Sequence, residues 1–201
     1  MSALEKVAQG GRTKSGFTFQ VLACRPESKG RVRLRDSSPF SKPVLEGLYL
    51  SGTDGADLLT LREGIKLGRK LSRTSAFDDL RGEELFPGAA VSSDEEIDQY
   101  IRSSIHSANA LTGSCRMGHE SDALAVLDPE LRVRGVQSLR VVDASAMPRI
   151  IGGQTAAPTI MLAEKAADMI LAERARTRAR LESQMHVGQH MAIPAPMPAP
   201  A

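Results

Sequence analysis

The stretch LRVVDASAMPRIIGGQTAAPTIMLAEKAADMI, residues 139–170, decides the fold of this chain. Leu139 to Val142 is a short apolar, β-branched run that suits a strand buried on both faces, and Asp143 ends it. The Gly152-Gly153 pair lets the backbone pass close to another group, and Thr155 can cap a following helix. The spacing predicts a strand, a tight turn and a helix N-terminus, whose N–H groups attract a phosphate or a ring carbonyl.

Apolar residues recur at helical spacing after Pro158, which suits the first turn of a helix. We expect one face of this helix to be buried and the opposite face to lie in water. The apolar positions are Ile160, Ala163, Ala167 and Ile170, and the charged positions are Glu164, Lys165 and Asp168.

Upstream, alternation of apolar and polar residues predicts a small antiparallel sheet. The residues of Phe17–Ala23 alternate, as do those of Arg31–Arg35, and the turn residues of Pro26–Gly30 lie between them. This pattern is typical of a hairpin. Leu48–Leu50 is the third candidate strand.

Two helices are predicted to follow the sheet. Thr53 or Asp54 caps the first helix. Ser93 and Glu96 form a capping-box pattern for the second helix, which leads directly to His106. Strands followed by helices indicate an α+β domain, whereas the later strand–turn–helix unit indicates an α/β nucleotide-binding domain.

Composition excludes several classes of function. A net charge of +2 and an aromatic content of 3% give no reason to expect a nucleic-acid partner. Cys24 and Cys115 are far apart and form no C-x-x-C pair, so we expect no disulfide framework and no metal site. No apolar run approaches the about 20 residues of a membrane span, so no transmembrane segment is predicted.

Three motifs carry a family pattern: GSCRMG at 113–118, DPELRVRGVQSLRVVDAS at 128–145 and GGQTAAPTIMLAEKAADMI at 152–170. Together they resemble the C-terminal part of the glucose–methanol–choline (GMC) family of FAD-dependent oxidoreductases. The resemblance implies FAD as the cofactor and a small molecule as the substrate. It also implies that five residues contact FAD, namely Asp143, Ala144, Gly153, Gln154 and Thr155.

The G-x-G-x-x-G turn through which this family holds the FAD pyrophosphate is absent from the sequence. We therefore expect the chain to be the C-terminal part of a longer enzyme whose N-terminal FAD-binding half is missing. The expected organisation is a partial linker at 1–14, a substrate domain at 15–137, the last strand and helix of a Rossmann-like FAD-binding domain at 138–173, and a disordered tail rich in Arg, Pro and Ala at 174–201.

The usual acid–base positions of the family hold residues that cannot abstract a proton. Most members have a histidine three residues before the glycine of the G-[TS]-C-x-M-G stretch, where this chain has Ala110. A second position commonly holds His or Asn, and here it is Gln154. Because neither of these two positions holds a proton acceptor, the sequence argues against ordinary alcohol oxidation.

The segment HSANALTGSCRMG, 106–118, resembles the fatty acid photodecarboxylase branch of the family. In that branch a histidine and an asparagine three residues apart match His106 and Asn109, and a cysteine near the substrate carboxylate matches Cys24. Arg33 is the best candidate for the arginine that binds the carboxylate, and Arg35 is the next. The resemblance implies a lyase of lipid metabolism, with a plastid location for the parent protein.

Two other hypotheses stay open. One is a conventional GMC alcohol dehydrogenase or oxidase in which His106 serves as a displaced base. The other is an orphan fragment that catalyses no reaction.

Overall fold

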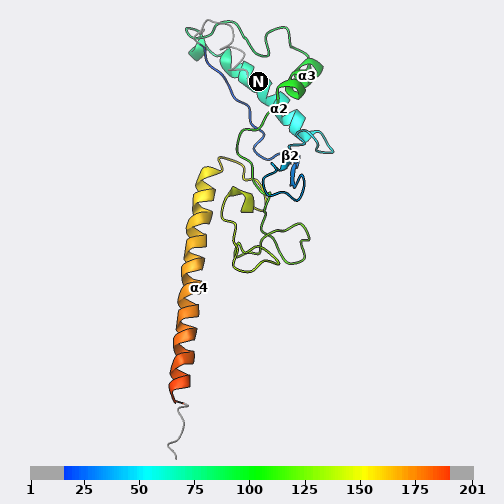
Figure 1. The fold of residues 1–201 in the computed structure, drawn as a ribbon. Helices are drawn as coiled ribbons and strands as arrows, with labels where there is room; N and C mark the ends of the chain where they lie inside the picture. The colour runs from blue at the N-terminus through cyan, green and yellow to red at the C-terminus, as the bar shows by residue number, and fades with distance from the viewer. Residues whose placement is uncertain (1–15, 191–201) are drawn as a thin grey trace, which may run out of the picture. The chain divides into compact units, whose positions relative to one another are not determined.

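The computed structural model describes residues 16–190, with side chains for residues 16–185. The predicted linker at 1–14 and the last part of the predicted tail, 191–201, lie outside this range. Contacts divide the chain into two compact units: a first unit of residues 1–114 and 149–154, and a second unit of residues 115–148 and 155–201. In chain order the elements are β1 Arg31–Arg33, β2 Val44–Glu46, α2 Ala56–Ser72, the short 3-10 helix η1 Ser75–Phe77, α3 Asp94–Ser104, the 3-10 helix η2 Ala144–Ala146 and α4 Ala156–His190 (Figure 1).

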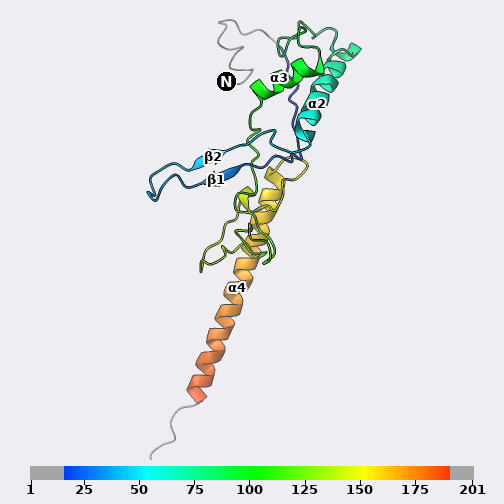
Figure 2. The same ribbon diagram turned by 90° about the vertical axis from the view of Figure 1, so that its right-hand side faces the viewer.

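The first unit contains a small antiparallel sheet, as the sequence predicts, but of the three predicted strands only the one at Arg31–Arg35 takes part in it. Strands β1 and β2 pair with Arg31 opposite Glu46, and together they form an extended arm (Figure 2). The predicted third strand at Leu48–Leu50 is wrong, because Leu48 and Leu50 have φ angles of 46° and 60°, in the left-handed region that a strand cannot use. The second strand of the sheet is β2 instead.

The predicted strand Phe17–Ala23 is not a strand, since no described residue pairs with its backbone. Its side chains pack on α2 instead. Val21 lies against Gly64, where a Cβ would collide with the valine methyl, and the Phe19 Cβ lies 3.6 Å from the place of a Cβ at Gly68. The alternation in Phe17–Ala23 therefore reflects packing on a helix. Gly64 and Gly68 of α2 leave room for these side chains.

Helices α2 and α3 lie side by side in the first unit (Figures 1 and 2). The predicted capping box of α3 is confirmed: the Ser93 side chain accepts from the Glu96 N–H, and the Glu96 carboxylate accepts from the Ser93 N–H. Helix α2 begins after Gly55, which is left-handed at φ 71°, while the Asp54 carboxylate accepts from the Ala56 N–H. The core of this unit consists of Leu58, Ile97 and Ile101.

The second unit is built from loops packed against the first half of α4. Its buried core residues are Leu127, Leu131, Ala146 and Ala166. The predicted strand Leu139–Val142 is reduced to a single bridge between Arg140 and Arg132. A strand buried on both faces needs a sheet neighbour on each edge, and the described residues supply only this short pairing. The Rossmann-like assignment of 138–173 stays a prediction.

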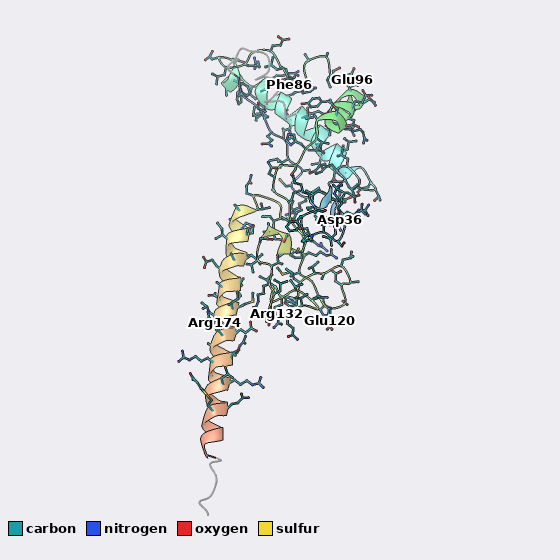
Figure 3. The ribbon with its side chains drawn as sticks, in the orientation of Figure 1. Asp36, Phe86, Glu96, Glu120, Arg132 and Arg174 are labelled. Atoms are coloured by element: carbon teal, nitrogen blue, oxygen red, sulfur yellow. The ribbon has the colours of Figure 1, made fainter. Side chains whose placement is uncertain are left out.

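Helix α4 differs from the prediction in its buried face and in its length. The residues that pack on the core are Leu162, Ala166 and Met169, whereas Ile160 of the predicted face is 63% exposed. The helix also continues to His190, where the composition predicts a disordered tail from 174. Ala, Leu, Glu and Arg are strong helix formers, which explains why this segment, which carries Arg174, is helical (Figure 3). No described helix has a stretch apolar and long enough to cross a bilayer.

Candidate functional site

His106 and Asn109 are organised by the serine between them. The segment follows α3, and the His106 Nδ1 lies 3.0 Å from the Ser107 carbonyl oxygen. The Ser107 hydroxyl accepts a 2.9 Å hydrogen bond from the Asn109 N–H. Asn109 has a φ of 58°, a left-handed conformation that asparagine tolerates better than most residues. Ser107 therefore contacts both predicted residues, and no pattern in the sequence indicates this role.

The tautomer of His106 follows from its partner. A carbonyl oxygen only accepts, so the Nδ1 must carry the hydrogen of this contact. In the neutral imidazole the Nε2 is then left with a lone pair. His106 and Asn109 are both exposed, so their side chains are accessible from solvent.

Cys24 lies at the surface of the first unit. It is exposed, and its thiol lies 3.8 Å from the Leu22 carbonyl oxygen. The next residue, Arg25, reaches the Gly152-Gly153 turn of the same unit, where a Cβ at Gly152 would lie 2.6 Å from the arginine Nε. The structure therefore brings the segment of Cys24 to the predicted flavin-facing turn.

The Arg33 guanidinium forms an ion pair with a carboxylate. It lies in β1, and its Nη2 is 2.7 Å from Glu46 Oε1 across the arm, while Arg31 pairs with the other oxygen of the same carboxylate. Hydrogen bonds from Arg31 and Arg33 hold the pKa of the Glu46 carboxyl below its usual range. Arg35 donates only a long 3.4 Å hydrogen bond to the Lys42 carbonyl oxygen.

In the second unit, Asp143 ends the bridge segment as predicted and caps η2. Its Oδ1 accepts hydrogen bonds from the Ser145 N–H at 2.7 Å and the Ser145 hydroxyl at 2.5 Å. Asp143 is exposed and Ala144 is half-buried. The carboxylate thus keeps one oxygen without a partner among the described residues.

The donors around Gly153 and Gln154 fit the edge of a flavin ring. Gly153 and Gln154 are both exposed, and a Cβ at Gly153 would meet no atom within 4 Å. The Gln154 amide both donates and accepts hydrogen bonds, as the ring carbonyls and N–H of a pyrimidine require. Within the described part of the chain no group accepts from the N–H of Ala156 at the start of α4.

The predicted cap of α4 is not seen, since no described N–H donates to the Thr155 hydroxyl. The Thr155 carbonyl oxygen instead accepts from Thr159, at 3.1 Å from its N–H and 2.7 Å from its hydroxyl.

Asp57 is a buried carboxylate that no pattern in the sequence indicates. It is 7% exposed, at the start of α2, and accepts hydrogen bonds from the N–H groups of Glu27 at 2.8 Å and Ser28 at 3.0 Å and from the Ser28 hydroxyl. Burial raises the pKa of Asp57, but the Ser28 hydroxyl and these two N–H groups more than offset it, and the pKa lies below its ordinary value. A carboxylate this well bonded is structural.

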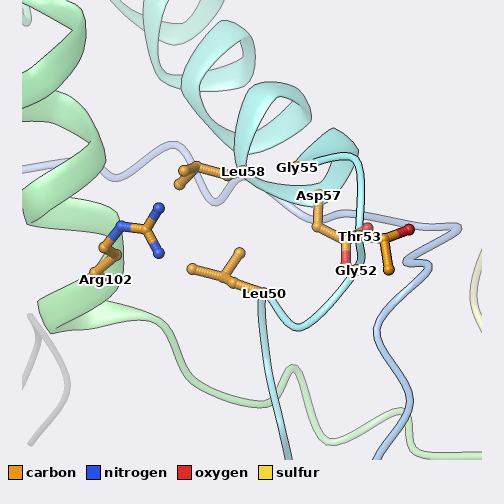
Figure 4. A pocket seen from close by; sticks show the side chains of 7 residues that line it. All are labelled: Leu50, Gly52, Thr53, Gly55, Asp57, Leu58 and Arg102. Carbon is orange, nitrogen blue, oxygen red and sulfur yellow. The ribbon is translucent and has the colours of Figure 1, made fainter.

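A cavity of about 230 Å³ lies beside Asp57 (Figure 4). In the close view the Arg102 side chain extends from α3 toward Leu50 and Leu58. The lining residues are Leu50, Gly52, Thr53, Gly55, Asp57, Leu58 and Arg102. None of the predicted site residues is among them, so this cavity is separate from the candidate site.

Comparison with known proteins places the chain in a family. The model of the family described as GMC oxidoreductase matches residues 26–163. A chloroplastic fatty acid photodecarboxylase of Chlamydomonas reinhardtii is 45% identical over 163 residues, which are 81% of this chain and 26% of that protein. An oxygen-dependent choline dehydrogenase of Vibrio vulnificus (strain YJ016) is 46% identical over 156 residues, or 78% of this chain and 28% of that protein.

Solved structures agree with the sequence relatives. An FAD-dependent oxidoreductase from Chaetomium thermophilum superposes with a TM-score of 0.67 at 30% identity, covering 76% of this chain and 26% of that one. The chain thus spans about a quarter of the length of the proteins it matches. The family match, the relatives and the superposition all lead to one conclusion: this chain belongs to the GMC oxidoreductases, whose cofactor is FAD.

Proposed function

We propose that the chain contributes the substrate-facing part of an FAD-dependent enzyme that converts a fatty acid to an alkane and carbon dioxide in light. The observation that carries this proposal is the chemistry of the two acid–base positions. Ala110 has no ionisable group, and the exposed Gln154 amide cannot take a proton near neutral pH. Decarboxylation by light needs no base at either position.

The cofactor contacts are assigned to two short stretches, Asp143–Ala144 and Gly153–Thr155. The open backbone at Gly153 and the exposed amide of Gln154 support this assignment. When bound, FAD supplies a light-excited ring that can accept an electron from a carboxylate.

The chain's own residues would hold the substrate carboxylate. The Asn109 amide donates two hydrogen bonds, and a protonated His106 would donate one from its Nε2, because its Nδ1 already donates to Ser107. Cys24 is the third proposed contact and is exposed. Arg33 stays the predicted cationic contact, although its pairing with Glu46 means that a second carboxylate has to compete for it.

A specific observation favours a second candidate, a conventional GMC alcohol dehydrogenase. In neutral His106 the Nε2 is left as a proton acceptor on an accessible ring, as a displaced base requires. The choline dehydrogenase relative is as similar in sequence as the photodecarboxylase, so identity does not separate the two activities.

The two candidates are separated by light. The product of the native gene, purified with its flavin, is supplied with a long-chain fatty acid under blue light and in darkness, and alkane and carbon dioxide are measured. We expect equal amounts of the two products in light and none in darkness. Lack of alkane in light from a protein that holds FAD rejects the proposal.

The competing activity is measured with choline in darkness. Reduction of the flavin by choline, with a loss of about 10²–10⁴-fold in His106→Ala, would establish the alcohol dehydrogenase instead. His119→Ala is the matched control, because His119 is also exposed and also hydrogen-bonded through its Nδ1 to a nearby serine, Ser121. A protein that binds no FAD and converts neither substrate is the non-catalytic orphan.

A further inference from the structure

The Arg25 side chain lies against the backbone of Gly152. A Cβ built on Gly152 would lie 2.6 Å from the arginine Nε and 3.0 Å from its Nη2. The φ angle of Gly152 is outside the left-handed region, so its backbone conformation does not require glycine. Because Gly152 has no side chain, the Arg25 guanidinium has room beside its backbone. Both residues belong to the first unit.

Arg25, like Arg73 and Arg102, lacks within the described chain the carboxylate partner that several other arginines of the first unit have. Arg33 pairs with Glu46, Arg62 with Asp94 and Arg69 with Glu84, in each case at hydrogen-bond distance. No carboxylate of the described residues lies within ion-pair distance of Arg25. The neighbour that the structure gives for its guanidinium is the Gly152 backbone, beside which the Nε, Cζ and Nη2 atoms lie.

We propose that Arg25 is a positioning residue that fixes the path of the Gly152-Gly153 turn and thereby orients Gln154 toward FAD. Two consecutive glycines have the largest backbone freedom of any dipeptide, and fixing them costs conformational entropy. At Gly153 a Cβ would meet no atom within 4 Å, so open space lies on that side of the turn. Arg25 is the neighbour that restrains this turn, directly before Gln154. The orienting role rests on the proposed function, while the restraint of the turn does not.

The two members of this contact are tested separately and together, in the product of the native gene. Gly152→Ala pushes the end of a flexible side chain aside and should leave the melting temperature unchanged. Arg25→Ala removes the guanidinium. We expect each variant to weaken FAD affinity by about tenfold and to change the visible circular dichroism of the bound flavin. The double variant should be no worse than either single one, because both remove the same contact.

Controls separate this role from a general loss of stability. Gly82→Ala is the control glycine substitution, since a Cβ at Gly82, unlike one at Gly152, meets no atom within 4 Å, and Arg73→Ala removes another exposed arginine of the first unit. Both controls should keep the flavin spectrum. Arg25→Lys keeps the charge but loses the flat fork, and we expect it to restore little of the affinity.

Backbone amide order parameters measured by NMR without FAD give a readout that does not depend on the cofactor. We expect lower order parameters at Gly153 and Gln154 in Arg25→Ala and in Gly152→Ala, because the turn is then less restrained. Unchanged order parameters, additive effects in the double variant, or a lower melting temperature with an unchanged flavin spectrum would each overturn the positioning role. Lower order parameters in a protein that binds no FAD would retain the Arg25 contact, reject its orienting role and reject the proposed function.

Discussion

Helices α2 and α4 show two ways in which one chain uses a helix. Helix α2 has 17 residues and contacts α3, the segment Phe17–Ala23 and the turn bonded to Asp57. Helix α4 has 35 residues, yet only Ala166 is buried along its described side chains. Apolar residues at helical spacing therefore identify both helices, but they identify the buried face only where the described chain also supplies the partner.

The largest effect is expected at the buried start of α2. Asp57→Asn replaces one accepting oxygen with an NH2 group that faces other donors, and we expect the free energy of unfolding to fall by about 3 kcal/mol in urea denaturation. Asp36→Asn is the control, because Asp36 also accepts from a nearby N–H, that of Ser38, but is exposed in the arm. It should change stability by less than about 1 kcal/mol.

The same substitution has a defined pH dependence. The folded-state pKa of Asp57 lies below its ordinary value, so its contribution to stability is full above about pH 4 and is lost as the pH falls through the folded-state pKa. The difference between the wild type and Asp57→Asn should therefore shrink in acid. A difference that stays constant from about pH 7 to about pH 2 would contradict this account.

A smaller effect on the free energy of unfolding is expected where the segment Phe17–Ala23 packs on α2. Gly64→Ala places a methyl group against Val21, and we expect a loss of about 1–3 kcal/mol in the free energy of unfolding. Val21→Ala in the same chain should recover part of it. Gly68→Ala is the matched control in the same helix: its Cβ makes only an ordinary 3.6 Å contact with Phe19, and it should stabilise the helix by about 0.5–1 kcal/mol. Equal costs at the two glycines would be inconsistent with the packing.

The smallest effect is expected on the exposed face of α4. Ile160→Ala should change the free energy of unfolding by no more than about 0.5 kcal/mol, because Ile160 is 63% exposed. Leu162→Ala, two residues away and packed on the core of the second unit, should cost about 2 kcal/mol. If the two substitutions cost the same in urea denaturation, the face of Ile160 is covered and the contrast between the helices fails.

Several signals whose interacting residues are close in the chain predicted the structure correctly, although the predicted Thr155 cap of α4 is not formed. The Ser93–Glu96 capping box and the charged arm strand at Arg31–Arg33 are both formed. Signals whose interacting residues are far apart in the sequence did not predict the structure correctly. The alternation in Phe17–Ala23 reflects the glycines of α2, and the β-branched run before Asp143 makes only one bridge.

The candidate site shows the same division. The positions of His106 and Asn109 in one short segment followed from their spacing, but the part played by Ser107 depends on a hydroxyl and a carbonyl whose directions no pattern encodes. The contact of Arg25 with Gly152 joins residues far apart in sequence. A periodic pattern in the sequence cannot predict this contact. The ion pair of Arg33 with Glu46, by contrast, could be inferred from the strand register, which places Glu46 opposite Arg31, two residues from Arg33.

The bonds of Ser28 have a consequence for how this part of the molecule can vary. Its hydroxyl donates to Asp57 and accepts from the Gly52 N–H at 3.3 Å, so the two ends of the stretch that carries the arm are fastened to each other. Residues gained or lost at the tip of the arm leave this base in place, because loop length changes the closure entropy only slowly. The arm is thus the part of the first unit that evolution, or a protein engineer, can lengthen, shorten or exchange without moving α2.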